Sequence, residues 1–243
     1  MTGRIVWWAT LAIIAVVTTA LQLDMQSRRT PQLASAVPAP LRSHAQTRIV
    51  RSALAGEDAT LAVREAERLV QRRPLPAESL ILLATAQAKA GQMEAAARTI
   101  QIAGQRGWRE PVAQEAVLRL ALAAGDKPEA ARRYAALFLN GQTPDALLEE
   151  LGRLVLDEPG GPGQQTVTAI VVGGERWHAA FLRRGAQVMP PKAFSAITVA
   201  SQEKGARFDC AMLDQAVLAV TRRDADAGAQ LQQAAADCPP ARS

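Results

Sequence analysis

The residue types best suited to metal binding and nucleophilic catalysis are scarce in this 243-residue chain, which contains two histidines and two cysteines. Neither His44 nor His178 has a cysteine, aspartate or histidine beside it at metal-ligand spacing. The motifs Gly-x-Ser-x-Gly, His-Glu-x-x-His and Cys-x-x-Cys do not occur. His178, in the segment ERWHAAF, is therefore expected to be a partly buried helix residue rather than a general base.

Carboxylates and glycines gather in one further stretch. A phosphate loop would need Gly-Lys-Ser/Thr after the run PGGPG at 159–163, which is absent, so this run is expected to be a hinge. Adjacent carboxylates on a helix are usually solvated, and a catalytic pair needs a cleft that the sequence does not indicate. We predict no catalytic residue, no metal ligand and no cofactor. The carboxylates concerned are Glu149, Glu150, Asp157 and Glu158.

The two cysteines, Cys210 and Cys238, both lie in the last segment of the chain. An even pair indicates a disulfide in an exported domain, whereas two free buried thiols are the alternative in a cytosolic one. Helices are predicted over 208–222 and 225–236, so the cysteines would lie at neighbouring points of an antiparallel hairpin. A disulfide would clamp this hairpin by ~3 kcal/mol if the chain-entropy model holds.

The elements that position the side chains of this chain are predicted to be helices. A pattern with a period of 34 residues runs from 43 to 142. Aligning 77–110 with 111–144 places Gly91 on Gly125 and Ala96 on Ala130. A glycine ends a helix in the left-handed conformation without a Cβ penalty, and a small residue lets two helices approach closely. The remaining shared positions are Ala62 in the first unit, whose loop glycine Gly56 is one residue early, and the apolar Leu80, Leu83, Ile100 and Ala103.

An apolar first helix, a glycine turn, a second helix with a small residue and a terminal proline, here Pro74, resemble the tetratricopeptide repeat. The alternative is a run of alanine-rich amphipathic helices that coincide by chance. The resemblance implies an all-α fold: a tetratricopeptide-like solenoid of helical hairpins, with three repeats over 43–144, an N-terminal transmembrane helix and a C-terminal helical extension.

The resemblance weakens beyond residue 144. Thr143 and Pro144 are typical of an N-cap followed by proline at the first helical position, which predicts a helix over 145–157. The segment TVTAIVV at 166–172 is rich in β-branched residues, yet a short helix fits its neighbours better than a strand. Further helices are predicted over 175–188 and 191–203. Residues 145–239 would thus form a degenerate fourth repeat, with Leu148, Leu151 and Gly152 in family positions, and a helical C-terminal module.

The N-terminus contains a stretch of 19 uncharged residues, Ile5 to Leu23, close to the ~20 that span a bilayer as a helix. We expect a transmembrane anchor over 1–23, with Trp7 and Trp8 at the membrane interface. The alternative is a cleaved signal peptide, because Thr18 and Ala20 form a passable cleavage site. The linker, residues 24–42, is expected to be an extended tether, because it contains RRTPQLASAVPAPL.

Charge, composition and the cysteine pair indicate which partners and which compartment to expect. Net charge is +5, but the arginines are scattered along helices and aromatic residues are only 4% of the chain, so we expect no nucleic-acid partner. Use of 24 arginines against 4 lysines suits a GC-rich bacterial genome. Arg4 before the apolar stretch and Arg28 and Arg29 after it do not favour export, whereas the cysteine pair does. The expected location is the bacterial inner membrane, single-pass, with a periplasmic soluble domain.

The tetratricopeptide family binds peptides along a concave face built from the first helix of each unit. Carried over by position, Arg51 and Arg119 would pair with carboxylates of an extended partner. The chain lacks the Lys and Asn clamp of the family's chaperone-binding members, and a solvated groove with no ligand is the alternative. The predicted partner-binding residues are Arg51, Glu78, Thr85, Glu115 and Arg119, with Thr47, Ile81 and Leu122 beside them.

The resulting functional hypothesis is a non-enzymatic, membrane-anchored periplasmic scaffold that binds a protein or peptide partner in cell-envelope assembly. The alternative is an accessory subunit of a membrane enzyme or export complex that is contacted through its transmembrane helix. A hydrolase with an unrecognised site in 159–238 is the least favoured hypothesis.

Overall fold

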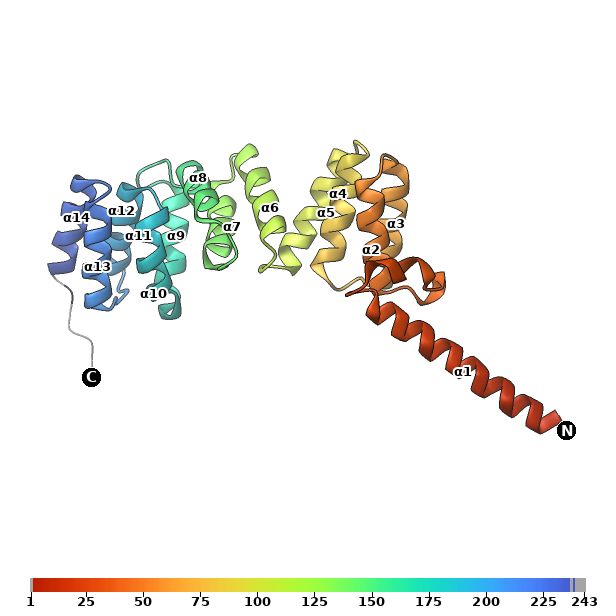
Figure 1. The fold of residues 1–243 in the computed structure, drawn as a ribbon. Coiled ribbons are helices and arrows are strands. Elements are labelled where there is room, and N and C mark those ends of the chain that lie inside the picture. Colours follow the sequence, from red (N-terminus) through yellow and green to blue (C-terminus); the bar gives the residue numbers. More distant parts are fainter. Residues whose placement is uncertain (1, 237, 239–243) are drawn as a thin grey trace. The chain divides into compact units, whose positions relative to one another are not determined.

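A computed structural model describes residues 2–236 and 238 of the chain. Every regular element in these residues is a helix, so the all-α class is confirmed for the part described. The helices form two compact units, residues 1–107 and 108–243. Figure 1 labels the helices of each unit.

Unit 1 contains a long N-terminal helix and two helix pairs. The first helices of its pairs, α2 and α4, contact each other, and α3 contacts α4. Its elements are α1 (Thr2–Gln26), the 3-10 helices η1 (Pro31–Ala36) and η2 (Ala39–Leu41), α2 (His44–Ala55), α3 (Ala59–Arg72), α4 (Ala77–Lys89) and α5 (Met93–Arg106).

Unit 2 continues with helix pairs in which each second helix contacts the next second helix: α7 contacts α9, α9 contacts α12, and α12 contacts α14. Along the first-helix side, α8 contacts α11 and α11 contacts α13. Its elements are α6 (Pro111–Ala123), α7 (Lys127–Leu139), α8 (Asp145–Val155), α9 (Pro162–Val172), η3 (Glu175–Trp177), α10 (His178–Ala180), η4 (Phe181–Gly185), α11 (Ala186–Val188), α12 (Pro191–Glu203), α13 (Cys210–Thr221) and α14 (Ala225–Ala236).

The helix pairs recur at a nearly constant interval. The first helices of the first four pairs begin at residues 44, 77, 111 and 145, which are 33, 34 and 34 residues apart. Gly91 and Gly125 end a first helix with φ of 76° and 74°, as the sequence predicts. Gly56 instead has φ −77° and needs no left-handed conformation. The aligned alanines are all buried: Ala62, Ala96 and Ala130 are 0%, 8% and 0% exposed.

The helix pairs of the two units have cores of different composition. The core of unit 1 is built largely from small residues, with Leu69 its largest fully buried side chain. The core of unit 2 adds aromatic residues: Phe181 lies 5.0 Å from Phe194 and 6.1 Å from Phe208, measured between ring centroids. A pair of rings at such distances contributes more than its buried area alone. Unit 2 therefore has the more extensive hydrophobic core.

The structure corrects two expectations for 143–163 and confirms the one for 166–172. Pro144, not Thr143, occupies the N-cap position of α8, and the buried Thr143 hydroxyl has no hydrogen-bond partner in the described residues. The run 159–163 is not a hinge throughout, because α9 begins at Pro162. A Cβ on Gly163 would lie 2.1 Å from the Val155 carbonyl oxygen, so this glycine permits close packing of α8 and α9. The helical prediction for 166–172 is confirmed.

The segment 175–188 is not one regular helix. It divides into η3, α10, η4 and α11, and η4 is a π-helical turn. A Cβ on Gly185 would lie 2.8 Å from the Phe194 ring, so the absence of a side chain lets this turn pack on α12. The hydrophobic pattern of the sequence does not indicate this local widening of the helix at Phe181–Gly185.

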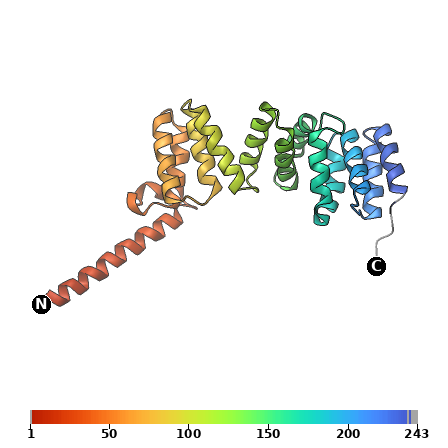
Figure 2. The same cartoon turned by 180° about the vertical axis from the view of Figure 1, so that it is seen from behind.

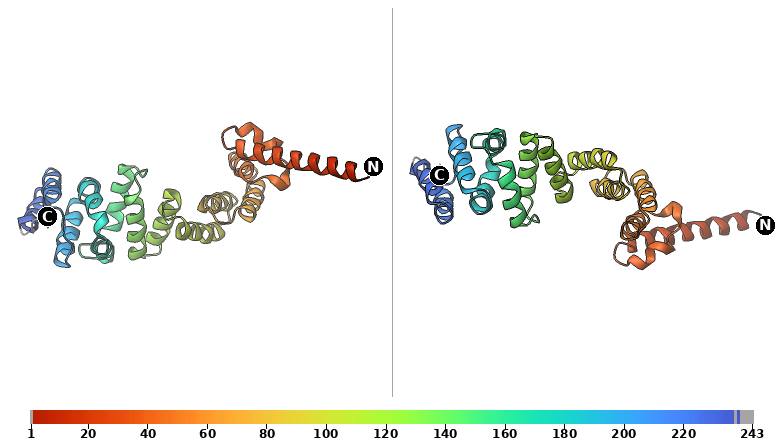
Figure 3. Two further views of the ribbon diagram at one scale, coloured as in Figure 1. Left: turned by 90° about the horizontal axis from the view of Figure 1, so that it is seen from below. Right: turned by 90° about the horizontal axis from the view of Figure 1, so that it is seen from above.

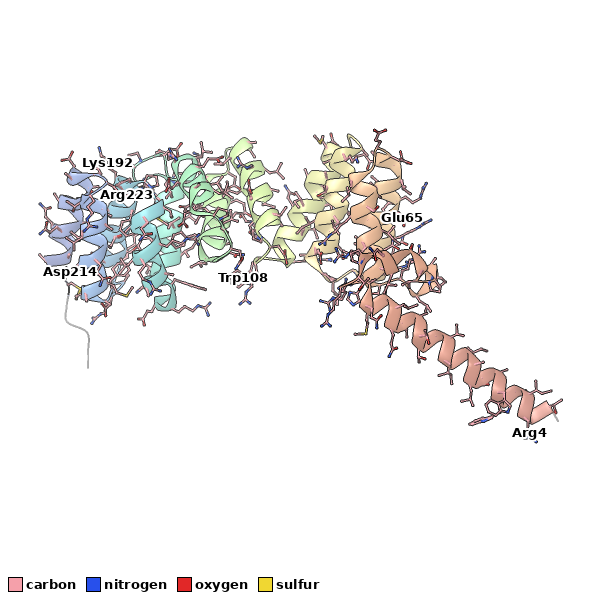
Figure 4. All side chains as sticks on the ribbon, viewed as in Figure 1. Arg4, Glu65, Trp108, Lys192, Asp214 and Arg223 are labelled. Carbon is pink, nitrogen blue, oxygen red and sulfur yellow. A yellow bond between two sulfur atoms is a disulfide. The ribbon has the colours of Figure 1, made fainter. Side chains whose placement is uncertain are left out.

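Helix α1 is joined to the first helix pair of unit 1 by a buried carboxylate. Asp24, in its last turn, is 3% exposed. Its oxygens accept hydrogen bonds from the backbone N–H groups of Ser43, His44 and Ala45, at 2.9, 3.0 and 2.9 Å. The Ser43 side chain does not cap α2, so Asp24 performs the capping from another helix. The far end of α1, where Figure 4 labels Arg4, extends away from the helix pairs of unit 1.

The prediction of an extended tether between α1 and α2 is wrong. This segment folds into η1 and η2, and both contact α1. Val37 and Ala34 are 1% and 5% exposed and pack with Ala45 at the start of α2. The physical reason is that the small apolar residues between the prolines have a surface to bury against. The linker therefore holds α1 against the first helix pair.

Among the described residues, α1 is the helix long and apolar enough to cross a membrane. Only 6% of its most apolar window is buried inside the protein, and Trp7 and Trp8 are 61% and 66% exposed. A helix of these properties near an N-terminus fits either a membrane span or a signal sequence. Figures 2 and 3 show its exposed length from three further directions.

We expect Ala130→Leu to lower the free energy of unfolding by about 1–3 kcal/mol, because a fully buried alanine at a close helix contact leaves no room for the larger side chain. Ala96→Leu should act in the same direction. The exposed Ala123 of α6 provides a control, since Ala123→Leu should change little. Chemical denaturation would measure all three, and unchanged stability of both buried-site variants would show that the 34-residue alignment misplaces the helix contacts.

We further expect Asp24→Ala to destabilise unit 1 by on the order of 2–4 kcal/mol, because it leaves buried N–H donors of α2 without acceptors. Asp24→Asn keeps an acceptor oxygen and should cost less. Hydrogen exchange of the Ser43, His44 and Ala45 amides would report the loss directly. The surface control Glu57→Ala should leave the protection of these amides unchanged. Unchanged protection in Asp24→Ala as well would contradict the capping role.

Candidate functional site

The predicted groove residues of unit 1 include an ion pair between consecutive first helices. Arg51 of α2 places Nη2 at 2.7 Å from Oε1 of Glu78 in the first turn of α4. The two side chains are 51% and 45% exposed. The structure thus brings together two residues that lie 27 positions apart in the sequence.

Unit 2 contains a corresponding arrangement. Arg119 of α6 contacts Glu115 on its own helix at 2.9 Å and Glu150 on α8 at 3.1 Å. Hydrogen bonds to Glu115 and Glu150 raise the pKa of the Arg119 guanidinium, so it is a permanent cation. Glu150 was expected only to be solvated, yet it joins α6 to α8. No local sequence pattern indicates this pairing, because the two residues are 31 positions apart.

The fifth predicted residue, Thr85, is exposed on α4, and its hydroxyl donates to the Ile81 carbonyl of the same helix. The five predicted residues therefore form two local sets, one in each unit, and a continuous groove through all five stays a prediction. The neighbouring predicted residues Thr47, Ile81 and Leu122 are partly exposed.

The ion pairs of these two sets are suited to exchange. An exposed pair contributes only about 0–1 kcal/mol, so replacing Glu78 or Glu150 by a carboxylate of a partner costs little. Arginine offers a planar fork that binds carboxylates through two hydrogen bonds. Each set therefore offers one arginine whose carboxylate partner is exposed and replaceable.

Other charged residues that sequence reasoning left unassigned hold helix ends in place. Arg184 in the π-helical turn donates to the carbonyls of Phe138 and Asn140 at 2.8 and 3.1 Å and to Asp145 at 2.8 Å. Arg223, labelled in Figure 4, donates to the Ala186 and Met189 carbonyls at 2.8 and 3.0 Å. Both arginines stabilise the ends of neighbouring helices through main-chain carbonyls.

His178 is also structural. It is 6% exposed, more buried than expected, and its ring lies 4.7 Å from that of Phe208. Nδ1 and Nε2 each lie 3.0 Å from a backbone carbonyl, those of Arg207 and Val171. Both nitrogens are thereby occupied by main-chain contacts. His178 links the C-terminal end of α9 to the chain before α13.

One carboxylate of the acidic stretch, that of Asp157, is paired with a lysine. Lys127 Nζ lies 2.8 Å from both carboxylate oxygens of Asp157, and this hydrogen bonding lowers the pKa of Asp157. The same ammonium donates to the Leu154 carbonyl near the end of α8 at 2.6 Å. In the part of the chain that the structure describes, no group of three His, Cys, Asp or Glu residues is placed to hold a metal ion.

The two cysteines form the predicted disulfide. Cys210 is the first residue of α13 and Cys238 follows α14, with their Cα atoms 5.9 Å apart. The bond links residues 28 positions apart and closes the last helix pair. A disulfide of this kind persists in oxidising compartments. Comparison with protein-family models, curated proteins and solved structures finds no match to this chain.

We expect protein isolated from intact cells to resist alkylation at both cysteines until it is reduced. Reduction should destabilise the α13–α14 hairpin by about 3 kcal/mol, because the open chain gains entropy, while unit 1 keeps its stability. Mass spectrometry after differential alkylation and denaturation with and without reductant would test this. Free alkylation of both thiols without reductant would contradict an oxidising location.

Proposed function

We propose that this chain is a non-enzymatic, membrane-anchored scaffold of tetratricopeptide-like helix pairs that binds a protein or peptide partner in the bacterial periplasm. The observation that carries the proposal is the spacing of the helix pairs at 33–34 residues next to one exposed apolar helix. Stacked helix pairs of this length form extended surfaces rather than enclosed catalytic pockets.

Contacts between consecutive first helices support binding through that side. Arg51–Glu78 joins α2 to α4, and Arg119–Glu150 joins α6 to α8. Both pairs lie on the helices that the tetratricopeptide resemblance assigns to partner binding. A peptide that carries carboxylates at intervals matches these arginines, and the glutamates they release can accept basic residues of the same partner.

The periplasmic location rests on two observations together. The apolar length of α1 supports anchoring in the inner membrane, and the Cys210–Cys238 disulfide supports an oxidising space for the soluble domain. Burial of Ala20 and Asp24 against unit 1 favours retention of α1 over its removal as a signal peptide, because cleavage after Ala20 would cut a helix that continues into a packed junction.

A specific observation also favours the alternative, an accessory subunit that is contacted through α1. The junction at Asp24 fixes the direction of α1 relative to the first helix pair. A helix held in this way can present one face to another membrane protein, whereas a loosely tethered anchor cannot. Trp7 and Trp8 would then face protein instead of lipid.

The scaffold proposal is tested by photo-crosslinking in native membranes. A crosslinker at Thr85 on α4 should capture a defined partner, whereas one at the exposed Glu67 on α3 should not. Arg51→Gln should reduce capture at Thr85 about tenfold, because a hydrogen bond to a charged group is worth about 1.5–3 kcal/mol. The exposed Arg98 on α5 supplies the matched control Arg98→Gln. Equal capture from both positions would refute a first-helix binding face.

Replacing residues 5–19 by an unrelated apolar sequence separates the two hypotheses, because Ala20 and Asp24 at the junction remain. The scaffold should keep its crosslinked partner and its activity in cells. Loss of both with intact membrane insertion, measured by resistance to a carbonate wash, would favour the accessory subunit.

A further inference from the structure

A pocket lined mainly by arginines lies beside the junction of α1 and α2, within unit 1. Its volume is ≈ 250 Å³. This is smaller than the ~300–1,000 Å³ typical of sites for drug-sized ligands. The lining residues are Arg28, His44, Thr47, Arg48, Arg51, Arg73 and Glu78.

The pocket has an excess of positive charge. Four of its residues are arginines and Glu78 is its one carboxylate, already paired with Arg51. Within the described residues no carboxylate lies at ion-pair distance from Arg28, Arg48 or Arg73. A pocket with this balance attracts an anion, and arginine binds phosphate through paired hydrogen bonds.

Contacts inside the pocket join its lining residues. Arg48 donates from Nη2 to the Arg28 carbonyl oxygen at 2.8 Å, which brings the turn after α1 against α2. Arg73 at the end of α3 places Nη1 3.5 Å from His44 Nδ1. Burial lowers the pKa of His44, and the nearby Arg73 and Arg28 lower it further against the opposing effect of Asp24. The neutral His44 ring therefore leaves the binding to the guanidinium groups.

The position of the pocket indicates which anion reaches it. The apolar stretch of α1 ends at Leu23, and the next residue, Asp24, binds the His44 N–H. Arg28 follows the stretch by five residues. The polar headgroup layer on each side of a bilayer is about 5–8 Å thick. If α1 spans the membrane, Arg28 therefore lies at the depth of lipid phosphates, and the pocket brings Arg48 and Arg73 beside it. Anionic lipids attract basic residues close to the membrane surface.

We propose that this pocket binds the phosphate of an anionic phospholipid headgroup in the membrane that α1 enters. The pocket shares Arg51 and Glu78 with the proposed partner-binding surface, but Arg28, Arg48 and Arg73, which are not among the proposed partner-binding residues, supply its unpaired charge. Lipid binding here would press the first helix pair against the bilayer surface and add to the orientation that Asp24 imposes on α1.

The test uses full-length protein in detergent and native mass spectrometry with added phosphatidylglycerol or phosphatidylcholine at constant ionic strength. Phosphatidylglycerol should bind more tightly, and Arg48→Gln with Arg73→Gln should weaken its binding about tenfold or more. The matched control is Arg64→Gln with Arg98→Gln, which removes the same charge from exposed positions of α3 and α5. Thermal unfolding would verify that both double variants remain folded.

Two lipid results would overturn the proposal: equal affinity for both lipids, or unchanged phosphatidylglycerol binding in the folded Arg48/Arg73 double variant. Inorganic phosphate forms the third arm. Millimolar phosphate should leave the lipid bound, because the acyl chains and the span keep the headgroup at high local concentration. Displacement of the lipid by phosphate would overturn the lipid assignment and identify a site for soluble anions. None of these outcomes depends on the peptide partner proposed above.

Discussion

The carboxylate of Asp24 joins the apolar helix to the folded part of unit 1. It is nearly inaccessible to solvent and accepts three backbone N–H groups at the start of α2. The first turn of an isolated helix lacks acceptors for these groups, and the positive end of the helix dipole favours a negative charge there. Capping from α1 therefore fixes both helices at once, and η1 and η2 fill the space between them.

Beyond this junction, the packing of the helix pairs depends on small residues that recur along the chain. Buried alanines in the second helices α3, α5 and α7 and left-handed glycines after two first helices allow closely packed pairs to recur. In unit 2 the contacts continue to the α13–α14 pair, which the disulfide also links covalently. Exposed arginines and glutamates on the first helices form ion pairs between consecutive first helices, Arg51–Glu78 and Arg119–Glu150.

Features set by local sequence were predictable, and features set by distant partners were not. Gly91 and Gly125 identify their turns because only the local backbone decides their conformation. The cysteine pair was predictable from its placement at two helix ends. Asp24 gave no such signal, because its acceptor role depends on amides 19–21 residues away. The same holds for Arg184, whose main-chain partners are 41–46 residues distant.

Distance measurements between spin labels at Thr10 on α1 and Thr60 on α3 test the central claim, that α1 is held rigidly on unit 1. Both positions are exposed, and the native cysteines are oxidised, so labels attach only at introduced thiols. In lipid nanodiscs we expect one narrow distance distribution that broadens with Asp24→Ala. A broad distribution in the chain that retains Asp24 would contradict it, because that result describes an anchor on a flexible tether.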